Sequence, residues 1–140
     1  MTGEHIPLRI HQETIFVDRS LGAAIVPDGL RAAGLTIKTM RDVYGEAPGA
    51  ATADVDWIAM AGDRGWIMFH KDARIRRNER ERQAVTEHAG RMFCITNANT
   101  TGADNLHRFL RCLAAIDRAA AHPGPFIYGV DATSIRKLFP

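Results

Sequence analysis

The sequence predicts an α/β fold with three layers, α/β/α, and a central, mostly parallel sheet. Short apolar or β-branched runs alternate with amphipathic segments along the 140 residues. Strands that alternate with helices in this way typically form a parallel sheet with helices on both faces. The length and the 46% hydrophobic content fit one compact domain with a single core.

The individual elements follow from periodicity and from helix and turn signals. We expect a short N-terminal arm over residues 1–12 and one domain over residues 13–140. Ser20 suits the N-cap of a helix that ends at Gly34, and Pro27 either kinks this helix or restarts it. The other predicted segments are strands over 13–18, 35–39, 66–70, 92–96 and 126–130, helices over 54–63, 76–88 and 102–121, a loop over 41–53 and a terminal turn over 131–140.

The composition argues against a membrane protein and against a disulfide-rich protein. No apolar run approaches the roughly 20 residues that a membrane-spanning helix needs, and the N-terminus lacks the pattern of a secretory signal. We therefore expect a cytoplasmic protein with no membrane partner. Cys94 and Cys112 share no metal-ligand spacing and are expected to be reduced thiols in the core.

Basic residues are concentrated in one short part of the chain. The net charge of +2 is too small to indicate nucleic-acid binding by itself, so the distribution of charge matters more. Two interpretations stay open: a solvated helix face, or a patch that contacts phosphate groups. The residues of this run are Lys71, Arg74, Arg76, Arg77, Arg80 and Arg82.

Acidic residues lie at or just after the ends of the predicted strands over 13–18 and 66–70. Two further acids begin the helix over 54–63, which leads into the second of these strands. Asp18 and Asp72 come just after apolar runs, and Asp54 and Asp56 open a helix. In a right-handed crossover, the start of a helix lies at the edge where the preceding strand ends, so these acids are expected at one edge of the sheet. Crowded carboxylates are costly unless a cation neutralises them, and Mg²⁺ or Mn²⁺ fits oxygen ligands. The alternatives are helix capping for Asp54 and ordinary loop positions for Asp18 and Asp72.

Three segments carry a resemblance to a known family. They are residues 16–22 (FVDRSLG), 54–58 (DVDWI) and 65–72 (GWIMFHKD). In order and spacing they resemble the PIN-like nucleases, in particular the branch of VapC45-type toxins, over about residues 14–139. The resemblance implies a Mg²⁺- or Mn²⁺-dependent ribonuclease, the toxin of a toxin–antitoxin pair. It also implies that the metal is held by Asp18, Asp54 and Asp72, with Asp56 as a competitor for the role of Asp54.

The chain departs from the family pattern at the site itself. His70 stands where the family usually has Thr or Ser, and it either supports the site or contacts phosphate, or is an ordinary structural histidine. A fourth acid is not evident. The candidates for a fourth acidic or supporting residue are Glu81, Asn97, Asp104, His70 and Ser20, although helix capping also accounts for Asp104.

The expected substrate is RNA, and its single-stranded or loop regions are the more accessible targets. The residues expected to contact its phosphate groups are Arg19, Lys71, Arg74, Arg76 and Arg77. A cognate antitoxin is the expected protein partner, and the sequence leaves a homodimer open.

Two other classes of protein compete with the nuclease interpretation. A degenerate, non-catalytic PIN-like module that binds RNA or a protein partner is one of them. A flavodoxin-like or receiver-like domain fits less well, because the first strand supplies only Asp18 and no phosphate-binding glycine loop is present.

Overall fold

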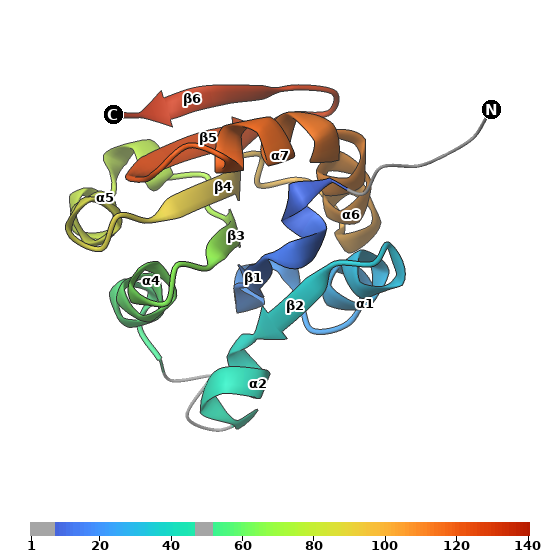
Figure 1. The fold of residues 1–140 in the computed structure, drawn as a ribbon, viewed down its shortest axis with the longest axis horizontal. Helices are drawn as coiled ribbons and strands as arrows, with labels where there is room; N and C mark the ends of the chain where they lie inside the picture. Colours follow the sequence, from blue (N-terminus) through green and yellow to red (C-terminus); the bar gives the residue numbers. More distant parts are fainter. Residues whose placement is uncertain (1–7, 47–51) are drawn as a thin grey trace.

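The computed structural model describes residues 8–46 and 52–140. Within them the chain forms one sheet in the order β2-β1-β3-β4-β5-β6 (Figure 1). Neighbouring strands from β2 to β5 are parallel, and β6 is antiparallel to β5. The predicted central, mostly parallel sheet is therefore confirmed. The strands are β1 (Thr14–Val17), β2 (Thr36–Thr39), β3 (Ile67–Lys71), β4 (Arg91–Ile95), β5 (Phe126–Val130) and β6 (Ile135–Phe139).

Helices cover both faces of this sheet, which gives the predicted three layers (Figure 1). One core contains residues of α1, α6 and α7, and the other contains residues of α2, α4 and α5. The helices are α1 (Ile25–Ala32), α2 (Met40–Tyr44), α4 (Asp54–Asp63), α5 (Glu79–Glu87), α6 (Gly102–Arg111) and α7 (Leu113–Ala120), with short 3₁₀ helices η1 (Arg9–Gln12), η2 (Arg19–Leu21) and η3 (Ile75–Arg77).

Side-chain alternation along the central strands decides which face carries polar groups. In β3, Ile67 and Phe69 enter the core under α1, α6 and α7, whereas Met68 enters the core under α4 and α5. His70 follows Met68 by two residues, and its ring contacts Trp57 of α4. Since successive strand side chains point to opposite faces, His70 lies on the face covered by α4 and α5.

The first predicted helix differs from the observed one. Ser20 does not cap it, because Asp18 caps the short η2 helix through the backbone N–H of Ser20. A separate helix, α1, begins at Ile25, and Pro27 lies in its first turn, where a proline is tolerated. Of the two alternatives for Pro27, the restart is the observed one. The helix ends before Gly34, whose φ of 89° suits glycine, as predicted.

Four other segments also differ from the expectation. The predicted helix over 76–88 is the 3₁₀ helix η3 followed by α5, which begins at Glu79. The expected terminal turn is wrong, because a turn closed by a 2.8 Å bond from Asp131 N to Ser134 O returns the chain, and β6 pairs with β5. The predicted long helix is two helices, since the backbone at Cys112 leaves helical geometry (φ −92°, ψ 5°). The predicted loop contains α2, which a Thr39–Asp42 capping box starts, and its residues 47–51 lie outside the described residues.

Part of the expected N-terminal arm packs on the domain. Ile10, in η1, is fully buried, and its backbone N–H donates to Asp117 Oδ1 at 2.8 Å. Residues 1–7 of that arm lie outside the described residues. Both cysteines are free and buried, as predicted. In the part of the chain that the structure describes, no helix is long and apolar enough to cross a membrane.

Candidate metal centre

Five polar side chains converge on the α4 and α5 face of the sheet, at the carboxyl ends of β1 and β3. The ligand atoms of Asp54, His70 and Glu81 lie within 4.8 Å of one another. Asp18 and Asp72 each approach one nitrogen of the same imidazole, at 2.9 and 3.8 Å. We call this group the carboxylate–histidine cluster, and its members are Asp18, Asp54, His70, Asp72 and Glu81.

His70 stands at the centre of the cluster. Its side chain is almost fully buried, and Trp57 packs edge-on against its ring at 5.2 Å. Nδ1 lies 2.9 Å from Asp18 Oδ2. Nε2 points the other way, 3.4 Å from Glu81 Oε1 and 3.8 Å from Asp72 Oδ2. The ring therefore joins acids that come from β1, the end of β3 and α5.

Asp18 is held by the backbone that follows β1. Its own N–H donates to Phe69 O at 3.0 Å, which ties the end of β1 to β3. Its Oδ2 accepts from His70 and from the N–H of Ser20 at 3.2 Å. The Ser20 hydroxyl in turn accepts from the N–H of Lys71 at 3.0 Å and lies 3.2 Å from His70 Nδ1. Ser20 thus supports the cluster rather than starting a helix.

Asp54 and Asp56 have different surroundings, although only one residue separates them. Ala53, not Asp54, occupies the N-cap of α4, and it makes no side-chain cap bond. Asp54 Oδ1 instead accepts from Trp57 Nε1 at 2.9 Å, which holds the carboxylate near His70. Asp56 is exposed and lines a separate hollow between α4 and α5. Only the first of these two acids joins the cluster.

Glu81 supplies the fourth carboxylate. It lies in the first turn of α5, where its N–H donates to the Asn78 side chain at 3.1 Å and its Oε2 accepts from the Asn78 amide. Its side chain is buried beside Ala84 and Val85, three and four residues later on the same helix face. An acid at a core-facing position of an amphipathic helix was the sequence signal for this role.

The electrostatics of the cluster are dominated by contacts with His70. Burial lowers the pKa of His70, but the nearby carboxylates of Asp18, Asp72 and Glu81 outweigh it and raise the pKa well above its usual value. Burial raises the pKa of Asp18, yet hydrogen bonds from His70 and Ser20 leave it lowered. The pKa of Asp72 is lowered chiefly by His70. His70 and the carboxylates of Asp18 and Asp72 therefore stabilise one another's charged forms.

Unsatisfied atoms show that the cluster suits a cation. Among the described residues, Asp18 Oδ1, His70 Nε2 and Glu81 Oε1 are buried without a hydrogen-bond partner. Buried polar atoms are normally satisfied, so several orphans in one place call for an explanation. A divalent cation that prefers oxygen ligands fits these carboxylates.

Asn97 and Asp104 do not belong to the cluster. Both line a separate hollow with His107 and Arg108. Asp104 is exposed and forms a capping box with Thr101 at the start of α6, with bonds of 3.0 and 3.2 Å. The Asn97 side chain accepts from the N–H of Asn99 at 2.9 Å. Capping is therefore the observed role of Asp104.

Removal of the cap should affect stability alone. Thr101→Ala deletes the hydroxyl that accepts from Asp104 N, so we expect the free energy of unfolding to fall by about 1 kcal/mol. Urea denaturation measures this change. Thr100→Ala is the matched control, because the Thr100 hydroxyl donates to Asn97 O and caps no helix; an equal loss in both variants would contradict the capping role.

The basic residues lie in several places around the cluster. Arg74 and Arg77, which follow Asp72 in the chain, line a hollow of about 330 Å³ together with Arg80. Arg76 is exposed but does not line it. The Lys71 ammonium donates to Thr100 O at 2.7 Å. Arg80 was part of the basic run, although it was not among the expected phosphate contacts.

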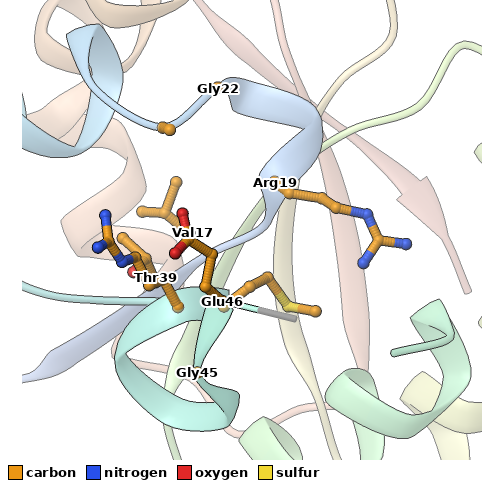
Figure 2. Close-up of a pocket in the computed structure, with 9 residues that line it drawn as sticks. Val17, Arg19, Gly22, Thr39, Gly45 and Glu46 are labelled. Atoms are coloured by element: carbon orange, nitrogen blue, oxygen red, sulfur yellow. The ribbon is translucent and has the colours of Figure 1, made fainter. Parts of the chain in front are cut away.

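A second hollow, of about 260 Å³, is lined by residues at and after the ends of β1 and β2 (Figure 2). Val17 and Arg19, the two neighbours of Asp18, line it, but Asp18 itself does not. In Figure 2 the Arg19 side chain extends away from Val17, Thr39 and Glu46, and its guanidinium donates to Thr52 O at 3.0 Å. This hollow therefore contains no member of the cluster.

Fold and site together define an α/β protein with a candidate metal centre at the carboxyl edge of a parallel sheet. The chain belongs to the PIN-like domain family, whose model matches residues 14–97. The matched region contains every member of the cluster. A protein of Mycobacterium tuberculosis named "Putative ribonuclease VapC45" is 50% identical over 124 residues, which cover 89% of this chain and 90% of the relative. No solved structure matches the chain.

Proposed function

We propose that this protein is a divalent-metal-dependent endoribonuclease, the toxin of a toxin–antitoxin pair. The carboxylate–histidine cluster carries this proposal, because it gathers four carboxyl groups around buried atoms that lack hydrogen bonds. Membership of the PIN-like family and the ribonuclease name of the relative support it. A cognate antitoxin and a cytoplasmic RNA substrate follow from the same assignment.

The cluster would hold Mg²⁺ or Mn²⁺ through carboxylate oxygens. Asp54, Asp72 and Glu81 present oxygens toward His70 Nε2, and Asp18 keeps Oδ1 without a hydrogen bond. A bound cation of this kind supplies an activated water and stabilises charge that develops on a scissile phosphate. The hydrogen bonds from Trp57, Ser20 and Asn78 hold three of the carboxylates in place.

The substrate phosphates would be held by arginines beside the cluster. Arg74 and Arg77 lie two and five residues after Asp72 in the chain, and Asn78 and Glu79, at the start of α5, line the same hollow. Arg19 follows Asp18, and the hollow that it lines with Met40 and Arg41 offers both apolar and charged surface. Such contacts position a backbone without reading its sequence, and single-stranded RNA is the accessible form.

A degenerate binding module is the less supported alternative, because the structure contains a fourth acid beside His70. It rested on the absence of a fourth acid and on His70. Glu81 now stands beside His70 with an unsatisfied buried oxygen, which is the feature expected of a metal site rather than of an abandoned one.

A cleavage assay tests the proposed function. The purified protein should cut single-stranded RNA when Mg²⁺ or Mn²⁺ is added, and EDTA should stop the reaction. RNA that stays intact at every metal concentration would argue for the binding module. Cleavage that continues in EDTA would show that the cation has no part in the reaction.

Arg77 provides a test of the phosphate contacts. Arg77→Ala should weaken RNA binding and reduce the slope of log affinity against log salt concentration by about 0.7, the value for one phosphate contact on a single strand. Fluorescence anisotropy with Asp18→Asn protein as the common background measures binding without cleavage. Arg118→Ala, on α7 and the opposite face of the sheet, is the control. Equal slopes for Arg77→Ala and the parent would contradict the assignment.

A further inference from the structure

We infer that His70 is a nitrogen ligand of the proposed centre, and that it makes the site select a first-row transition cation such as Mn²⁺ over Mg²⁺. This inference rests on the proposed metal site. It assigns to His70 a role beyond that of the carboxylates, and it predicts which cation the protein prefers.

The hydrogen bonding of Nδ1 fixes how the ring is presented. Nδ1 lies 2.9 Å from Asp18 Oδ2, and the ionised carboxylate can only accept, so Nδ1 carries the proton and donates it. Nε2 then faces Glu81 Oε1 and Asp72 Oδ2, and a carboxylate oxygen of Asp54 lies within 4.8 Å of a ring nitrogen. The same carboxylates raise the pKa of His70, so a cation that binds Nε2 takes the place of a proton there. A histidine that binds a metal through one nitrogen and donates the other N–H to a carboxylate is a common arrangement in metal sites.

The alternative of an ordinary structural histidine explains less. A buried structural histidine is expected to have both ring nitrogens hydrogen-bonded. His70 is only 2% exposed, yet among the described residues Nε2 makes no hydrogen bond of good geometry, and its neighbours are the carboxylates of Glu81 at 3.4 Å and Asp72 at 3.8 Å. Two neighbours restrict the ring: Trp57 packs against it edge-on, and Ser20 lies 3.2 Å from Nδ1. The unsatisfied nitrogen therefore points into the acids in a fixed orientation.

The donor set determines the preferred cation. Mg²⁺ is a hard cation that prefers oxygen ligands and keeps several waters. An imidazole nitrogen is a softer donor, and affinity for nitrogen sites rises from Mn²⁺ along the first transition series. Compared with an all-oxygen centre of the same charge, a centre with carboxylates and one imidazole therefore has a higher ratio of Mn²⁺ affinity to Mg²⁺ affinity.

Calorimetric titration of the protein with Mg²⁺ and with Mn²⁺ tests this inference. His70→Thr removes the imidazole and keeps a β-branched side chain that suits a strand. We expect Mn²⁺ affinity to fall about tenfold or more, with a clearly smaller change for Mg²⁺. His107→Gln, an exposed histidine of α6, is the control and should leave both affinities unchanged. A Mn²⁺-to-Mg²⁺ preference that is the same in His70→Thr and the parent overturns the inference.

A spectroscopic measurement on the unaltered protein makes the test independent of how the variant folds. Pulsed electron paramagnetic resonance of bound Mn²⁺ should show coupling to a directly coordinated nitrogen. Absence of that coupling overturns the role of His70. RNA cleavage in Mg²⁺ separates this outcome from failure of the proposed function. If His70 is not a ligand, an all-oxygen site would still cut RNA. If the protein binds neither cation and leaves RNA intact, both the inference and the proposed function are wrong.

Discussion

Asp18→Asn is expected to lower metal-dependent RNA cleavage at least about 100-fold, which corresponds to about 2.7 kcal/mol of transition-state stabilisation. Asp18 is 1% exposed and contributes charge at the point where β1, Ser20 and His70 meet. Asparagine has the same shape, so the fold should persist while the negative charge and one hydrogen-bond acceptor are lost. Single-turnover cleavage rates with Mn²⁺ measure the effect, and circular dichroism checks the fold.

Asp28→Asn is the matched control for that substitution. Asp28 is an exposed acid of α1 that pairs with Arg31 at 3.7 Å, on the other face of the sheet from the cluster. Its cleavage rate should equal that of the parent. Similar rates for the parent and for folded Asp18→Asn would remove Asp18 from the proposed centre.

Glu81→Gln should lower cleavage by a similar factor, at least about 100-fold. The side chain is 6% exposed, and its unsatisfied Oε1 lies 3.4 Å from His70 Nε2. Glutamine preserves the volume and can still accept from Asn78, so local packing of α5 should be retained. The measurement is again a single-turnover cleavage rate, at several Mn²⁺ concentrations.

Glu87→Gln controls for a change of charge on the same helix. Glu87 ends α5, is exposed and accepts a 2.8 Å hydrogen bond from Gln83 Nε2. We expect parental cleavage from it. If Glu81→Gln also cleaves at the parental rate, the fourth carboxylate is structural and the centre consists of the three aspartates alone.

The fold was largely predictable because short apolar, strand-like runs alternate with amphipathic, helix-like segments along the chain. The helix over residues 54–63 has the predicted bounds, since Trp57, Ile58 and Ala61 mark its buried face. β6 was missed because its identity depends on pairing with β5 rather than on its own pattern. The break between α6 and α7 was missed because the apolar pattern continues through Cys112.

The candidate site was predictable in part. Asp18, Asp54 and Asp72 were expected at one edge, and the structure brings all three toward His70. The alternation of side chains along the strands also predicts that His70 and Asp18 share a face. Asp18 lies two residues after Phe16, and His70 lies two residues after Met68, and Phe16 and Met68 belong to the same core. The burial of Glu81 could be read from its position on the same face of α5 as Ala84 and Val85, but its approach to His70 depends on how α5 packs beside α4, which no local pattern gives.

Thermal unfolding in the presence of Mn²⁺ tests the central claim, that the carboxylate–histidine cluster binds a divalent cation. At a Mn²⁺ concentration 100 times the Kd, binding should add about 2.7 kcal/mol of stability, or roughly 8 °C in Tm for a domain of this size. Asp54→Asn should lose most of that shift, whereas Asp56→Asn, an exposed acid two residues away, should keep it. Equal shifts in the two variants, or no shift in the parent protein, would contradict the claim.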